Sequence, residues 1–346
     1  MKTISIVIPC YNEVENVNPI SFAVINVMEE ALPEYNFEII FIDNCSTDGT
    51  RDILELLCEK DKRIKAIFNV TNFGQFNSPF YAMCQARGDC VICMCCDFQD
   101  PVELIPVFVH KWEEGHKIVS GVKTSSKENR FIYFLRTVYY KMIKNMSTTQ
   151  MIEHFTGFGL YDKTFISILR QLDDPIPFIR GIVAEYGHGF NRVEVEYEQP
   201  RRRAGKTHNN FYSLYDAAML SFTSYTKVGL RLATFLGFFS SALSLGIAVF
   251  YLIYKLTHWY TFQAGNAPMV IGIFVIGSLQ LFFIGLLGEY ILNINTRVIH
   301  RPLVVEEKRL NFEASEERKN TEKEKSREQG KGWEQEKDRE QKRDGE

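Results

Sequence analysis

The sequence predicts an α/β domain with a mostly parallel sheet, followed by a juxtamembrane segment and two membrane-spanning helices. Two observations lead to this fold class. In the N-terminal part, short apolar runs rich in β-branched residues alternate with stretches of helical periodicity, a pattern typical of parallel strands covered by helices on both faces. Farther along the chain, two uncharged apolar runs are each long enough to cross a bilayer. A soluble single-domain protein is therefore not expected.

The strands and helices of the α/β domain are predicted in regular alternation. The expected strands are the apolar runs at residues 4–8, 38–42, 64–69 and 90–95. The helices expected between them end near residue 30 and cover residues 50–60 and 76–86. Parallel sheets bind ligands at the carboxyl ends of their strands. The polar residues that follow each strand are therefore the candidate site.

Polar residues follow all four predicted strands. They lie in segments 9–13, 43–50, 71–75 and 97–101, and each segment carries carboxylate, amide or glycine groups. Turn formation and helix capping explain any one of these segments taken alone. Four such segments in series at one edge of a sheet indicate a binding site.

The two apolar runs predict a transmembrane helical hairpin. The first run covers residues 232–254, and the second begins near Met269 and ends before Glu289. As a helix the first run spans roughly 35 Å, against a bilayer hydrocarbon core of about 30 Å. The connection contains Trp259, an aromatic residue suited to a membrane interface. Buried core helices are the alternative interpretation.

The distribution of positive charge predicts the orientation of this hairpin. Lys227 and Arg231 precede it, and Arg297 and Arg301 follow it. Cytoplasmic segments next to membrane spans carry an excess of Lys and Arg. We therefore expect a multi-pass protein of the plasma membrane, with the N-terminal domain and both termini in the cytoplasm.

The overall charge gives no reason to expect a nucleic-acid partner. The chain carries 40 Lys and Arg against 43 Asp and Glu, a formal net charge of −3, whereas nucleic-acid-binding domains are usually basic. Residues 306–346 hold 12 of the basic and 14 of the acidic side chains. Such a composition cannot bury a core, so we expect a charged, disordered tail from residue 297 onward.

Five motifs give the sequence a specific resemblance. IVIPCYNE, FIDNCSTDGT, NFG, DFQDPVELIP and RAGKTH occur in this order before the two apolar runs. Together they resemble the family-2 glycosyltransferases that act on polyprenyl phosphates, a group with dolichol-phosphate mannose synthases and GtrB-type undecaprenyl-phosphate glucosyltransferases. The resemblance extends to about residue 300. It implies a Rossmann-like GT-A fold, a nucleotide-sugar donor, a divalent cation, and a lipid-phosphate acceptor at the membrane.

The resemblance places donor binding after the first three strands. The matching positions are Pro9, Tyr11, Asn12, Glu13, Asp43, Asn72 and Gly74. By the resemblance, Asp43 corresponds to the carboxylate that holds the base or ribose of the nucleotide. A carboxylate can accept hydrogen bonds from a base N–H or from ribose hydroxyls. The alternative role of Asp43 is that of a helix-capping residue in a turn.

The fourth strand end carries the expected metal site. Asp97 corresponds to the second acid of the family's D-x-D motif, and Gln99 to the amide two positions on. Oxygen ligands of this kind suit Mg²⁺ or Mn²⁺, which would neutralise charge on the departing diphosphate. The first acid of the motif is Cys95 here, so one carboxylate ligand is missing. Asp100 either supports this site or caps the helix that begins at Pro101.

The RAGKTH motif is expected to receive the acceptor. Arg202, Gly205 and Thr207 match the family's Arg/Gly/Ser loop, with Thr in place of Ser. The arginine fork can bind a phosphate group, and the alternative is ordinary juxtamembrane charge attracted to anionic lipids. Asp97, Arg202 and Thr207 are therefore the predicted catalytic residues.

A second departure from the family pattern concerns the acceptor. Gly157 occupies a position where family members often carry an acid. An alcohol acceptor would need a base at this point, whereas a phosphate monoester with a second pKa near 6 is already ionised at neutral pH. The missing acid therefore favours a phosphate acceptor over a growing polysaccharide.

The sequence predicts a chain of four segments and a single enzymatic activity. The segments are a GT-A domain at 1–209, an amphipathic juxtamembrane segment at 210–231, the hairpin at 232–296 and the tail at 297–346. The predicted activity is inverting transfer of a sugar, with UDP-hexose as the expected donor, to a polyprenyl phosphate. Cys95 and Gly157 leave one alternative open, a catalytically weakened membrane-anchored binding partner in a glycan pathway. A homo-oligomer also remains open.

Overall fold

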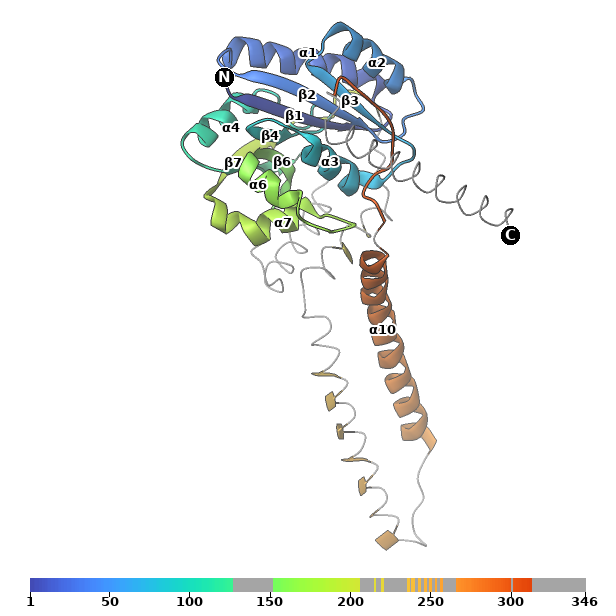
Figure 1. The fold of residues 1–346 in the computed structure, drawn as a ribbon. Helices are drawn as coiled ribbons and strands as arrows, with labels where there is room; N and C mark the ends of the chain where they lie inside the picture. Colours follow the sequence, from blue (N-terminus) through green and yellow to red (C-terminus); the bar gives the residue numbers. More distant parts are fainter. Residues whose placement is uncertain are drawn as a thin grey trace, which may run out of the picture.

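The computed structural model describes residues 1–126, 152–205, 266–299 and 301–312, together with isolated positions, one or two residues at a time, between 215 and 257. Its centre is an eight-stranded sheet with the order β7-β5-β6-β4-β1-β2-β3-β8. Helices cover both faces of this sheet, and α10 extends away from the domain as a long rod (Figure 1).

The elements follow the order expected of an α/β domain. The strands are β1 (Thr3–Cys10), β2 (Asn36–Asp43), β3 (Ile64–Asn69), β4 (Cys90–Cys93), β5 (Ile118–Ser126), β6 (Phe155–Asp162), β7 (Arg192–Gln199) and β8 (Glu306–Leu310). The helices are α1 (Val14–Ala31), α2 (Thr50–Lys60), α3 (Gly74–Gln85), α4 (Leu104–Glu113), α6 (Lys163–Leu169), α7 (Ile179–Tyr186), the short 3₁₀ helix η1 (Gly187–Phe190) and α10 (Asn266–Val298). The four predicted strands and the helices between them are confirmed, except that β4 ends at Cys93 rather than at residue 95.

The sheet is mostly parallel, as its apolar strands predict. β1 pairs in parallel with β2 and β4, β2 with β3, and β5 with β7, whereas β6 and β8 run antiparallel to their neighbours. Alternate residues of β1 enter different cores: Ile6 and Ile8 pack with α1, α2 and α4, and Val7 packs with α3, α6 and α7. Both faces of β1 are therefore buried, because successive side chains of a strand point to opposite faces.

The eighth strand corrects the expected tail. β8 pairs antiparallel with the edge strand β3, with Ala66 opposite Leu310 and Phe68 opposite Lys308. Val304 is buried beside it, and Leu310 packs against the core. The strand could not be predicted from its charged composition, because an edge strand can keep charged side chains in water while its backbone completes the sheet. Residues 313–346 lie outside the described part of the chain.

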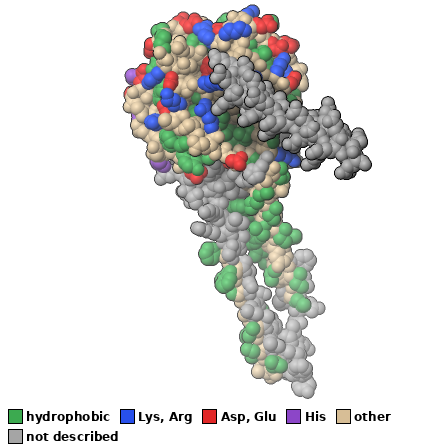
Figure 2. Space-filling model, in the orientation of Figure 1, with side chains coloured by type: hydrophobic (Ala, Val, Ile, Leu, Met, Phe, Trp, Pro, Cys, Tyr) green, Lys and Arg blue, Asp and Glu red, His purple; other side chains and the backbone are tan. Residues whose placement is uncertain are grey.

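The second apolar run forms helix α10. Within the residues that the structure describes, it is the one helix long and apolar enough to cross a bilayer, over Val275–Asn295. Hydrophobic side chains gather along this rod, whereas charged side chains cover the α/β domain (Figure 2). About half of the first apolar run lies outside the described residues, as does most of the segment 210–231. The two-helix hairpin therefore stays a prediction.

Candidate active site

The turns after β1 and β2 are joined into one surface at the carboxyl edge of the sheet. Asn12 has a φ of 55°, in the left-handed region, which turns its backbone toward the second turn. Its N–H donates to Ser46 Oγ (2.8 Å), and its Oδ1 accepts from the N–H of Thr47 (2.8 Å). The N–H of Glu13 donates to Thr50 Oγ1 (2.9 Å). The structure therefore brings the first two predicted donor-binding segments together.

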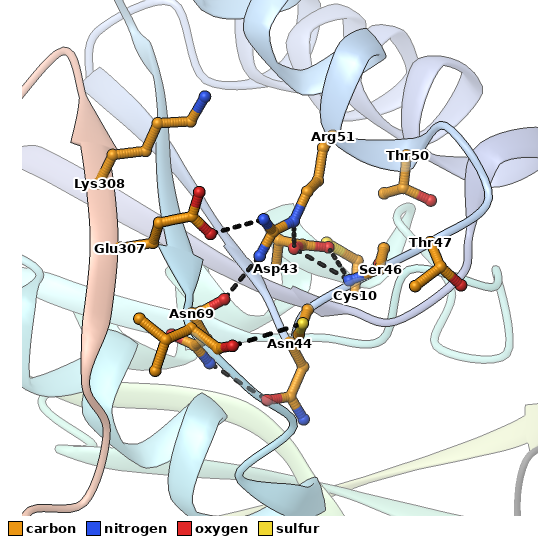
Figure 3. Close-up of polar contacts among 12 residues, drawn as sticks. Cys10, Asp43, Asn44, Ser46, Thr47, Thr50, Arg51, Asn69, Glu307 and Lys308 are labelled. Atoms are coloured by element: carbon orange, nitrogen blue, oxygen red, sulfur yellow. Dashed lines mark hydrogen bonds and ion pairs between the residues drawn. The ribbon is translucent and has the colours of Figure 1, made fainter.

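Asp43 ends β2 and is fully buried at this edge. Its carboxylate accepts from the N–H of Ser46 (Oδ2 at 3.1 Å) and from Arg51 Nε (Oδ2 at 2.7 Å), as Figure 3 shows. Gly49, not Asp43, occupies the N-cap of α2, so the helix-capping alternative is wrong for this residue. In this conformation Asp43 organises the turn that follows β2.

Asn44, which the sequence analysis did not single out, connects the second and third strand ends. Its Nδ2 donates to Asn72 Oδ1 (2.7 Å) and to the carbonyl of Gly74 (3.2 Å). Its Oδ1 accepts from Asn69 Nδ2 (3.1 Å) and Ser78 Oγ (2.8 Å). A buried amide with this many partners fixes the loop that carries the predicted residues. In the sequence, its position directly after Asp43 could have indicated that Asn44 belongs to the site.

Gly74 begins α3 with a backbone that favours glycine. Its φ is +85°, a left-handed conformation that costs glycine no steric energy. Its N–H donates to Asn72 Oδ1 (2.8 Å). Asn72 and Gly74 therefore form one fixed turn at the donor edge.

Arg202 joins the first and fourth strand ends. Its guanidinium forms ion pairs with Asp97 Oδ2 (3.3 Å) and with Glu13 Oε1. The N–H of Arg203 donates to the carbonyl of Asp97 (3.2 Å), and Asn16 Nδ2 donates to the carbonyl of Ala204 (3.2 Å). The predicted acceptor loop thus lies directly against the predicted metal and donor residues. Thr207 lies outside the described residues.

The carboxylates around Arg202 suit a divalent cation that a substrate helps to bind. Asp97 and Glu13 share one guanidinium, and their side chains are only 9% and 10% exposed. Gln99 donates its backbone N–H to Asp97 Oδ1 (3.1 Å). Among the described residues there is no group of three His, Cys, Asp or Glu side chains placed to hold a metal ion. The two carboxylates of Asp97 and Glu13 are oxygen donors that fit Mg²⁺ or Mn²⁺, provided that phosphate oxygens and water complete the coordination.

Asp100 has a supporting role beneath this turn. It is buried, and it accepts from the N–H of Cys95 (2.9 Å) and from the hydroxyl of Tyr197 (3.0 Å). Burial raises the pKa of the Asp100 carboxyl above its ordinary value, and these hydrogen bonds counteract part of that effect. The N-cap of α4 is Glu103, so Asp100 does not cap this helix. Cys95 is exposed at the position of the missing acid.

Gly157 lies in β6 with a φ of +105°. A Cβ at this position would come within 3.2 Å of Ile179 Cγ2. An acidic residue would therefore be strained here. The backbone at this position therefore suits glycine better than an acidic residue.

The mostly parallel sheet with polar groups at the carboxyl ends of its strands defines a Rossmann-like α/β domain. The sequence profile described as glycosyl transferase family 2 matches residues 5–174. A bactoprenol glucosyl transferase of Shigella phage SfV is 31% identical over 300 residues, which cover 86% of this chain and 96% of that protein. The uncharacterized glycosyltransferase YkoT of Bacillus subtilis is 32% identical over 308 residues, covering 86% of this chain and 89% of YkoT.

Solved structures show a more distant similarity. Glucosyl-3-phosphoglycerate synthase from Mycobacterium tuberculosis has a TM-score of 0.44 and 14% identity, with 64% of this chain and 76% of that chain covered. The sequence relatives decide the assignment: the chain belongs to glycosyltransferase family 2 and is a glycosyltransferase.

Proposed function

We propose that this glycosyltransferase moves a hexose from a nucleoside diphosphate, with UDP as the expected nucleotide, to a polyprenyl phosphate. The contact of Arg202 with both Glu13 and Asp97 carries the proposal, because it unites a phosphate-binding cation with the donor edge. The relatives named bactoprenol glucosyl transferases support the same acceptor class.

The donor lies across the carboxyl ends of β1, β2 and β3. The turn after Asp43 and the fixed loop at Asn72 and Gly74 present polar groups to the nucleotide. Pro9 lies near the end of β1, and Tyr11, Asn12 and Glu13 follow this strand in the first of these turns. Asp97, with the side chain of Gln99, would hold Mg²⁺ or Mn²⁺, and this cation would neutralise charge on the leaving diphosphate.

The acceptor phosphate approaches Arg202. An oxygen of the lipid phosphate forms a bond to the anomeric carbon while the bond from that carbon to the diphosphate oxygen breaks. The nucleoside diphosphate departs with the bonding electrons, and the anomeric configuration inverts. The acceptor oxygen carries no proton at neutral pH, so the reaction needs positioning and charge stabilisation rather than a base. A glycine at position 157 is compatible with this chemistry.

Helix α10 supports a reaction at a membrane surface. Its apolar surface over Val275–Asn295 suits the bilayer interior, and a lipid carrier requires a catalytic domain close to the headgroups. The positive charges on either side of the apolar region favour the cytoplasmic leaflet of the plasma membrane. The predicted first span would make the protein multi-pass.

The decisive experiment is a transfer assay with the purified full chain. Undecaprenyl phosphate is mixed with Mg²⁺ or Mn²⁺ and with radiolabelled UDP-glucose, UDP-galactose or GDP-mannose, and organic-extractable label is counted. We expect label from at least one UDP-sugar. Absence of extractable label from every donor would contradict the proposal.

Cys95 motivates the second candidate function, a binding partner that has lost most of its turnover. The substitution Cys95→Asp restores the missing acid and separates the two functions. We expect turnover in the same assay to stay unchanged or fall, because Asp97 and Glu13 already share the site and a third carboxylate adds repulsion. A large gain from near-zero turnover would instead identify a weakened enzyme.

A further inference from the structure

The strand that follows α10 contributes a side chain to the donor edge. Glu307 of β8 forms an ion pair with Arg51 (Oε2 to Nη1, 2.7 Å), and Arg51 in turn holds Asp43. Figure 3 shows this chain of contacts running from β8 to the end of β2. Glu307 and Arg51 are 256 residues apart in the sequence.

The guanidinium of Arg51 connects three strands. Nε donates to Asp43 on β2, Nη1 donates to Glu307 on β8, and Nη2 donates to the carbonyl of Asn69 on β3 (2.6 Å). Each of its nitrogen atoms therefore has a protein partner. Arg51 acts on its neighbours by fixing their positions rather than as a ligand for substrate.

The position of β8 is set independently of this ion pair. The N–H of Val70 donates to the carbonyl of Val305 (3.1 Å), and the hydroxyl of Tyr81 donates to Glu306 Oε1 (2.8 Å). Asn311 Nδ2 donates to the carbonyls of Cys58 (2.6 Å) and Ile64 (2.7 Å). These contacts hold the strand on the domain, so the side chain of Glu307 reaches Arg51 from a fixed backbone.

We infer that β8 is part of the donor-binding edge, and that Glu307 and Arg51 are positioning residues that fix Asp43 and the turn after β2 for the nucleoside. The inference rests on the proposed function, in which this turn receives the donor. Asp43 is fully buried, so its influence on the nucleoside passes through the turn that it fixes through Ser46. The segment following the membrane helix thereby completes the substrate site.

Two substitutions and a matched control separate positioning from stability. Glu307 is 49% exposed, and an ion pair this exposed contributes little to stability, so Glu307→Gln should leave the thermal midpoint nearly unchanged. Arg51→Gln leaves the buried Asp43 without its cation and should lower the midpoint. The control is Lys308→Gln on the same strand, which breaks an ion pair with Glu55 that does not reach Asp43.

The readouts are the affinity of the full chain for UDP, measured by calorimetry, and the Michaelis constants for donor and acceptor. We expect Glu307→Gln to weaken UDP binding about threefold and Arg51→Gln about tenfold. The KM for the UDP-sugar should rise in parallel, with the KM for undecaprenyl phosphate unchanged. Lys308→Gln should match the wild type throughout.

The outcomes distinguish this inference from the proposed function. Wild-type protein that binds neither UDP nor GDP overturns the proposed function and the inference with it. Wild-type protein that binds UDP, with unchanged affinity in the Glu307→Gln variant, shows that β8 only stabilises the fold. If Arg51→Gln fails to fold, the Glu307→Gln result decides alone.

Discussion

Arg202 provides the strongest prediction, because its removal is expected to affect both stability and catalysis. The substitution Arg202→Gln removes the cation between Asp97 and Glu13 and the bond from Nε to the carbonyl of Ala204 (2.8 Å). The two carboxylates that remain are about nine-tenths buried, whereas Arg202 itself is 20% exposed. Breaking a fully buried pair costs about 3–5 kcal/mol, so about 2–3 kcal/mol is expected here.

The catalytic effect should exceed the loss of stability. Loss of a charged donor aimed at a reacting phosphate lowers the rate roughly a hundredfold. Stability is measured by thermal unfolding of the purified full chain, and we expect the midpoint to fall by about 5–10 °C. Catalysis is measured as the initial rate of transfer to undecaprenyl phosphate. Arg201→Gln, at an adjacent exposed arginine, is the matched control and should change neither quantity much.

A double substitution tests the physical reason for this prediction. Adding Glu13→Gln to Arg202→Gln removes one of the two uncompensated carboxylates, so part of the lost stability should return while the activity stays low. The coupling between the two sites is obtained from a double-mutant cycle. If the Arg202→Gln variant has the same thermal midpoint and the same transfer rate as the Arg201→Gln variant, the ion pairs do not organise the site. That result would refute the reasoning.

Two further substitutions test the fold around the site. Burial opposes ionisation of Glu38, but its bonds from Lys65 (2.6 Å), Ser5 and the N–H of Arg87 lower its pKa below the ordinary value of 4.5. The contribution of Glu38 to the free energy of unfolding is therefore present at neutral pH and is lost as the pH falls below 4.5. Glu38→Gln should lower the free energy of unfolding by about 2 kcal/mol at pH 7. At pH 4 the difference between variant and wild type should be smaller. An equal difference at both values would contradict the linkage. Gly157→Asp should lower stability by about 1–3 kcal/mol without raising transfer activity, because φ is +105° there; a stable and more active variant would disprove the backbone explanation.

Local patterns in the sequence were sufficient to predict the first four strands and the polar edge of the sheet. The apolar residues 39–42 are buried on both faces of β2, as expected of an apolar run without alternating polar residues. The turn residues after these strands were also predictable, because parallel strands place their carboxyl ends at one edge. Asn44 and Arg51 were missed because neither residue type indicates its partners.

The sequence by itself determined the family, the alternation of strands and helices, and the presence of apolar segments suited to a membrane. Only the tertiary structure decided that Arg202 contacts Asp97, 105 residues away, and that Glu307 reaches Arg51. It also decided that the charge-rich segment Glu306–Leu310 forms a strand. Apolar periodicity is a local property of the chain, whereas ion pairs and edge pairing depend on where distant segments of the folded backbone meet.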